Sequence, residues 1–111
     1  MNTPSEMPLT FREHRDAYLA SLSPAERKVY DEEYAQAKLR RATAELIYDA
    51  REAAGLTQAQ LAERAGTSQA VISALENGAR TPTLALLTRL AAGLGVTIDL
   101  AIGTTRVTLT R

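Results

Sequence analysis

The spacing of apolar residues changes along the chain and predicts a mainly helical protein that ends in a β-hairpin. Between Pro24 and Gly55 the sequence has no further Gly or Pro and consists mostly of good helix formers. This stretch predicts one helix of about 46 Å at ~1.5 Å per residue, and a break near Arg40 is the alternative. From Val96 the apolar positions alternate with polar ones instead. With a turn at 103–105, this alternation indicates a hairpin over 96–111.

Three short patterns mark where helices begin. Thr10 with Glu13 and Thr57 with Gln60 have the spacing of capping boxes, and Ser23-Pro24 precedes Glu26 in the same way. In this arrangement a hydroxyl and a carboxylate or amide satisfy backbone N–H groups that the helix leaves unpaired. We expect helices from Thr10 to about residue 21, from Ser23 onward, and from Thr57 to about residue 65.

Two further helices follow. Gly66 and Thr67 form a tight turn, and Ser68 caps a helix that runs from 69 to about 76. Asn77 and Gly78 close this helix, because both residue types tolerate the left-handed backbone conformation. The last helix opens at 81–83 and ends at 93 or 95, where the sequence has glycines.

Composition excludes several classes of function. The chain has no Cys, which rules out disulfides, thiolate zinc ligands and a thiol nucleophile. Its only histidine, His14, has no matching set of catalytic partners and is expected on the surface. We expect no catalysis, cofactor or metal. The first residues lack the pattern of a signal peptide and no long apolar run is present, so we expect a cytoplasmic protein that does not enter the membrane.

Charge is distributed unevenly, although 13 basic and 13 acidic residues cancel. Residues 1–39 carry a net charge of −2, whereas 40–95 and 96–111 each carry +1. This is a weak electrostatic footprint for a nucleic-acid-binding protein. A single copy should bind DNA weakly, so we expect two copies to act on one duplex.

The segment 56–80 predicts a helix-turn-helix, in which the second of two short helices enters the major groove of DNA. Small residues allow the two helices to cross closely, and larger apolar residues have the spacing of an inward face. The small residues are Ala62, Ala65 and Gly66, and the inward ones are Leu61, Val71, Ile72 and Leu75. The outward positions of the second helix carry no acidic side chain, as a surface that faces phosphates requires.

The stretch GLTQAQLAERAGTSQAVISALENGARTP resembles the phage repressor and Cro family, also called the XRE family, over about residues 42–95. The resemblance implies a lambda-repressor-like bundle in which Gln58 and Gln69 meet phosphates and Gln69 also reaches a base. It implies an ion pair between Arg51 and Glu76. The DNA-binding positions expected from it are Thr57, Gln58, Thr67, Ser68, Gln69, Ala70, Ser73, Ala74, Asn77 and Arg80, with solvation as the alternative for Arg80.

The regions outside this segment suggest a more particular role. A helical arm (1–40), a DNA-binding domain (41–95) and a hairpin (96–111) together resemble antitoxins of the HigA type. Such proteins bind a RelE/HigB-like ribonuclease toxin and repress their own operon as dimers on a palindromic operator. The alternatives are an autonomous transcriptional regulator without a toxin and an adaptor that binds only protein.

The arm carries more apolar side chains than a solvated helix needs. Tyr30 and Tyr34 lie one turn apart beside the acidic run 31–33, and aromatic anchors rimmed by charge are typical of interfaces. We expect a toxin-binding surface at Phe11, Tyr18, Leu22, Tyr30 and Tyr34. The alternative is that these tyrosines pack near Tyr48 on the bundle.

The C-terminal alternation predicts the site of dimerisation. An isolated two-stranded hairpin is marginal in water, and this one exposes Val96, Ile98, Leu100 and Ile102. We expect hairpins of two copies to pair along an edge and to place two recognition helices about 34 Å apart, one turn of DNA. A dimer along the long helix is the alternative.

Overall fold

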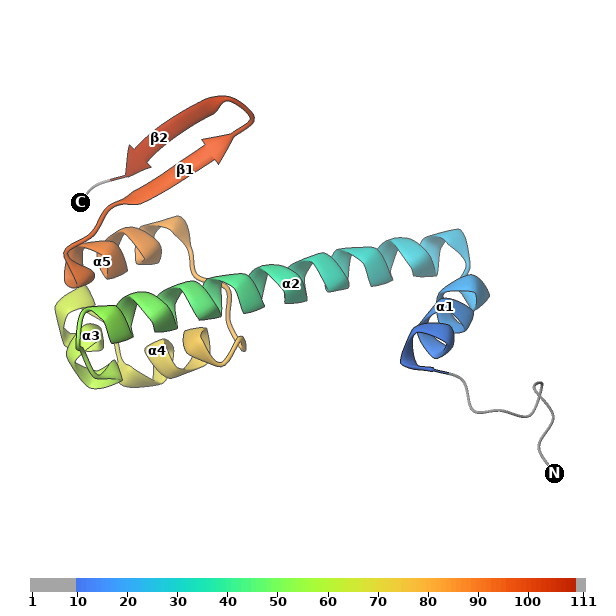
Figure 1. The fold of residues 1–111 in the computed structure, drawn as a ribbon, viewed down its shortest axis with the longest axis horizontal. Coiled ribbons are helices and arrows are strands. Elements are labelled where there is room, and N and C mark those ends of the chain that lie inside the picture. The colour runs from blue at the N-terminus through green and yellow to red at the C-terminus, as the bar shows by residue number, and fades with distance from the viewer. Residues whose placement is uncertain (1–9, 110–111) are drawn as a thin grey trace. The chain divides into compact units, whose positions relative to one another are not determined.

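The computed structural model describes residues 10–109 and confirms the mainly helical fold with a C-terminal hairpin (Figure 1). The elements in this range are α1 (Phe11–Ser21), α2 (Pro24–Ala53), α3 (Gln58–Ala65), α4 (Gln69–Glu76), α5 (Leu84–Leu94), β1 (Ile98–Ile102) and β2 (Thr105–Leu109). The outer ends of the expected arm and hairpin, 1–9 and 110–111, lie outside the described residues, as does the stretch considered for a signal peptide. None of the described helices combines the length and apolar character that a bilayer crossing requires.

The chain divides into two compact units, with the boundary between Ala35 and Gln36. The first contains α1 and the beginning of α2, and the second contains the rest of α2 with all later elements. Helix α2 is continuous from Pro24 to Ala53, so the break considered near Arg40 is absent.

The expected caps are present at the helix starts. The Thr10 hydroxyl accepts a hydrogen bond from the Glu13 amide at 3.1 Å, and the Glu13 carboxylate accepts one from the Thr10 amide. Before α2, the Ser23 hydroxyl and the Glu26 carboxylate form the same reciprocal pair. Hydrogen bonding to Ser23 lowers the pKa of Glu26. These bonds define where α1 and α2 begin.

The core of the second unit is small and aliphatic. Helices α3, α4 and α5 pack around the C-terminal half of α2 (Figure 1), and the largest fully buried side chains are Leu61, Ile72, Leu75 and Leu90. A Cβ atom at Gly93 would lie 3.1 Å from the Cβ of Arg64, so α5 approaches α3 closely. Val71, expected to face inward, is half-buried at the edge of this core.

Two helix ends differ in detail from the sequence expectation. Asn77 has a φ of −92° and is therefore not left-handed. Of these two residues, Gly78 adopts the left-handed conformation, with a φ of +77°. Helix α5 passes through Gly93 and is capped by Gly95, whose φ is +73°. The Val96 amide then donates to the Ala91 carbonyl at 2.9 Å and completes this cap.

That cap shortens the hairpin. Val96 belongs to the cap that follows α5, and β1 therefore begins at Ile98 rather than at Val96. The pairing Ile102–Thr105 leaves a two-residue turn, so Thr105 is the first residue of β2 and lies outside the turn. On one face Ile98 pairs with Leu109 and Leu100 with Val107, whereas Asp99 and Thr108 form a hydrogen bond on the other. The hairpin is thus amphipathic, and its Ile102 side chain is 78% exposed.

Candidate nucleic-acid interface

The turn between α3 and α4 sets the direction in which α4 begins. Gly66 adopts a φ of +68°, and the Thr67 amide donates to the Ala62 carbonyl at 2.9 Å. The Ser68 hydroxyl accepts a hydrogen bond from the Val71 amide at 3.2 Å and caps α4. A side chain at Gly66 would meet no steric obstacle, so the backbone conformation is what requires glycine here. The result is two short helices joined as in a helix-turn-helix.

An ion pair between Arg51 and Glu76 ties the end of α2 to the end of α4. Arg51 Nε donates to Glu76 Oε2 at 2.7 Å, and Arg51 Nη2 donates to Glu76 Oε1 at 2.8 Å. The two side chains are only 9% and 5% exposed. The hydrogen bonds to Glu76 raise the pKa of Arg51 above its ordinary value, against the opposing effect of burial. The structure thus brings together the two residues that the resemblance paired.

The same guanidinium reaches a third segment. Arg51 Nη1 donates to the Leu56 carbonyl at 2.8 Å, in the loop that leads into α3, and the guanidinium lies 5.3 Å from the centre of the Tyr48 ring. Glu76 Oε1 also accepts a hydrogen bond from the Gln58 side chain at 3.3 Å. The Gln58 amide, which the resemblance assigns to a phosphate, is therefore held against Glu76 in this structure.

The expected DNA-binding residues come from three adjoining segments: the start of α3, the turn with α4, and the loop after α4. Six of them are exposed: Thr57, Ser68, Gln69, Ala70, Asn77 and Arg80. Four are half-buried: Gln58, Thr67, Ser73 and Ala74. The Asn77 side-chain oxygen accepts a hydrogen bond from the Ala79 amide at 2.9 Å and so stabilises the turn.

Acidic groups are kept away from the outward surface of α4. Its sequence, QAVISALE, contains a single carboxylate, that of Glu76, and the ion pair neutralises and buries it. The surface formed by Gln69, Ala70, Ser73 and Ala74 therefore carries no negative charge. Elsewhere in residues 10–109, carboxylate and histidine side chains do not gather in threes that could hold a metal.

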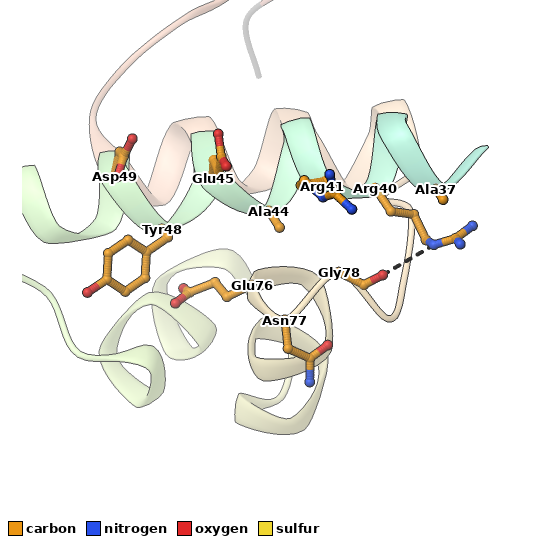
Figure 2. A pocket seen from close by; sticks show the side chains of 10 residues that line it. All are labelled: Ala37, Arg40, Arg41, Ala44, Glu45, Tyr48, Asp49, Glu76, Asn77 and Gly78. Carbon is orange, nitrogen blue, oxygen red and sulfur yellow. Dashed lines mark hydrogen bonds between the residues drawn. The ribbon is translucent and has the colours of Figure 1, made fainter. Parts of the chain in front are cut away.

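One contact of the second unit was not expected from the sequence. Arg40 Nε donates to the Gly78 carbonyl at 3.2 Å, across a groove of about 400 Å³ between α2 and the end of α4 (Figure 2). The sequence shows only two adjacent arginines within a long helix. Their proximity to the turn after α4 depends on how the two helices pack, which residue spacing does not reveal.

The residues expected to bind a toxin lie in the first unit. The rings of Tyr18 and Tyr30 meet edge to face at 6.1 Å, and those of Tyr30 and Tyr34 are stacked at 6.3 Å. Phe11 is 84% exposed and Leu22 is half-buried. The tyrosines thus pack on one another, whereas the Tyr48 ring of the second unit lies against Arg51.

Comparison with known proteins places this geometry in a family. Residues 47–100 match the family described as helix-turn-helix. An uncharacterized HTH-type transcriptional regulator from Methanothermobacter thermautotrophicus is 48% identical over 50 residues, which cover 45% of this chain and 72% of that protein. No solved structure matches significantly. The chain belongs to the helix-turn-helix family, of the XRE type.

The ion pair generates a prediction about stability. Arg51→Ala and Glu76→Ala should each lower the free energy of unfolding by about 3–5 kcal/mol, because each leaves one buried charge without its partner. Urea denaturation followed by circular dichroism measures the change. The double variant Arg51→Met/Glu76→Leu should be more stable than either single variant, since it strands no charge.

Glu52→Gln is the matched control. Glu52 lies 3.2 Å from Arg51 Nη1 but is 55% exposed, so its loss should cost less than about 1 kcal/mol. If Arg51→Ala unfolds at the same urea concentration as the wild type, the ion pair does not stabilise the fold.

Proposed function

We propose that this chain is a transcriptional regulator that binds double-stranded DNA in the cytoplasm and inserts α4 into the major groove. The observation that carries the proposal is the outward surface of α4, which is free of acidic groups because its single carboxylate is buried against Arg51. A helix with this surface can approach phosphates without electrostatic repulsion. The relative from Methanothermobacter, named as a transcriptional regulator, supports the same role.

The side chains of α4 suit a modest readout of sequence. Gln69 is exposed at the first position of the helix, and a glutamine amide can form two hydrogen bonds with adenine. Ala70 and Ala74 offer only methyl groups, which fit the methyl group of thymine. Thr57 and Ser68 stand at helix N-termini, where backbone N–H groups favour phosphates. Specificity therefore depends mostly on Gln69.

Such limited contacts call for two copies on one duplex. The hairpin offers a surface for self-association, because Leu100, Ile102 and Val107 form an exposed aliphatic group on one of its faces. A two-fold dimer joined there would present two α4 helices to successive major grooves, about 34 Å apart, and would bind a palindromic operator.

The more particular role that we propose is that of an antitoxin of the HigA type, which neutralises a RelE/HigB-like ribonuclease and represses its own operon. Its support is the first unit, where three tyrosines pack together beside a groove of about 370 Å³. Asp31 is paired with Arg27 at 3.0 Å, but the exposed Glu32 and Glu33 beside the aromatic side chains suit a basic partner. An autonomous regulator without a toxin partner is the second candidate, favoured by the name of the relative.

DNA binding is tested by substituting Gln69 and Arg80. Gln69→Ala should lose about 1–3 kcal/mol of discrimination on the promoter of the protein's own gene, with a smaller loss on random DNA. Arg80→Ala should weaken all sequences alike and reduce the salt slope by about one unit, because it removes a phosphate contact. Fluorescence anisotropy at several salt concentrations separates the two effects. Equal losses on both DNAs for Gln69→Ala would remove it as a base reader.

Dimerisation is tested by two neighbouring substitutions in β1. Ile102→Lys places a charge on the exposed aliphatic face and should shift the equilibrium towards monomer, because burying an unpaired ammonium group is unfavourable. Ala101→Glu places a charge on the opposite face, across from Arg106, and should leave the dimer intact. Light scattering over a range of protein concentrations measures both. A dimer that persists in Ile102→Lys would place the interface elsewhere.

The antitoxin role is tested by co-expression with the small protein encoded beside this gene. Phe11→Ala and Tyr34→Ala should abolish protection of the cells and co-purification of the neighbour, because they remove exposed aromatic anchors. Both variants should still bind DNA. Leu39→Ala, 48% exposed on α2, is the control and should protect fully. Full protection by the two aromatic variants would favour the autonomous regulator.

A further inference from the structure

Three arginines, called here the arginine cluster, belong to the two segments that meet where the chain leaves α4. Arg40 is hydrogen-bonded through Nε to the Gly78 carbonyl, Arg41 is its exposed neighbour on α2, and exposed Arg80 follows Gly78 by two residues. Figure 2 shows the Arg40 side chain reaching to the turn, with the tip of its guanidinium beyond the bonded atom. The bond occupies Nε, and neither Nη1 nor Nη2 donates to another residue in the range 10–109, so both can bind a ligand.

The charge of the surrounding groove is strongly divided. Arg40 and Arg41 line the end beside Gly78, whereas Glu45 and Asp49 line the groove about one to two helical turns further along α2 (Figure 2). Glu76 also lines the groove, but Arg51 neutralises it. The groove is therefore positive only beside the turn at Gly78. An anionic ligand would bind at that end and be repelled from the other.

This cluster holds much of the free positive charge of the DNA-binding region. Residues 40–95 contain six arginines and no lysine, and Glu76 neutralises one of the six, Arg51. Three of the remaining five form the cluster at Arg40, Arg41 and Arg80. A protein with so little net charge gains most from DNA if its free cations lie together where phosphates pass.

We infer that Arg40 and Arg41 bind phosphates of the DNA strand that borders the groove occupied by α4. The inference rests on the proposed function. A helix that lies in a major groove about 12 Å wide has a sugar–phosphate strand on either side, so the residues around its end meet phosphates. Guanidinium groups bind phosphate oxygens through two parallel hydrogen bonds. Helix α2 thereby extends the contact beyond the helix-turn-helix itself.

An acidic protein segment would be attracted to the same arginines. DNA is favoured because exposed Arg80 follows in the loop after α4 and because the outward surface of α4 carries no acidic group. A phosphate strand lying along that surface passes the arginines without meeting Glu45 or Asp49.

The test compares full-length Arg41→Gln and Arg40→Gln with wild type. Arg106→Gln, an exposed arginine of β2, is the matched control. The probes are two duplexes of about 30 base pairs, roughly three turns of B-DNA: one from immediately upstream of the protein's gene, the other of mixed sequence. Each variant should bind both duplexes about five- to tenfold more weakly at ~0.1 M salt and lower the salt slope by about 0.9. The control should match wild type.

Arg40 needs a second variant, because its loss also removes the bond to Gly78. Arg40→Lys keeps the positive charge but lacks the planar set of N–H donors of arginine. Its salt slope should therefore be that of wild type, whereas the slope of Arg40→Gln is lower. A slope that stays low in Arg40→Lys would mean that Arg40 acts only by holding the turn, and would overturn its role as a phosphate ligand.

The results distinguish a failure of the proposed function from a failure of the inference about Arg40 and Arg41. Wild-type protein that binds neither duplex would overturn the proposed function together with this inference. Wild-type protein that binds DNA, with Arg41→Gln and Arg40→Gln equal to it in affinity and salt slope, would overturn this inference alone. In that second case the cluster would be a candidate surface for an acidic protein segment.

Discussion

The second unit depends on one buried guanidinium group. Arg51 connects three segments of the chain. It lies near the end of α2, donates a hydrogen bond to the carbonyl of Leu56 before α3, and forms two hydrogen bonds with the carboxylate of Glu76 at the end of α4. The N–H groups of a planar guanidinium point in fixed directions, so its hydrogen bonds define angles as well as distances. The tilt of α4 relative to α2 is therefore set by directed bonds, in addition to the aliphatic contacts beneath them.

Directed bonds matter here because the core is thin. The fully buried large side chains are leucines and one isoleucine, while Tyr48, the aromatic residue of this unit, is exposed. Aliphatic packing is not directional, and a small core tolerates several similar arrangements of its helices. The ion pair favours the arrangement in which Arg51 reaches both Glu76 and the Leu56 carbonyl.

Features that depend on neighbours in sequence could be predicted, and those that depend on packing could not. The caps at Thr10, Thr57 and Ser68 join groups three residues apart, so residue type and spacing suffice to find them. The ion pair joins residues 25 apart and was expected only from a family resemblance. The bond from Arg40 to Gly78 spans 38 residues and had neither kind of support.

The same distinction explains the smaller differences. Both Asn77 and Gly78 tolerate a left-handed backbone, and the sequence cannot choose between them. The structure uses Gly78, because the Asn77 side chain is engaged with the Ala79 amide. Val96 fits the alternation of apolar and polar residues that predicts a strand, yet its amide completes the cap of α5. In each case a hydrogen bond donated by a backbone amide of the neighbouring turn decides.

The outward surface of α4 also bears on how such a protein can change over evolutionary time. Gln69 and Ala70 are exposed and lie outside the core cluster, whereas Ile72 and Leu75 of the same short helix are fully buried. Substitutions at the exposed positions away from caps cost little folding free energy. A gene duplicate could therefore acquire a new preferred base sequence in a few mutations, without first accumulating spare stability, and separate copies in one genome could diverge to avoid cross-talk.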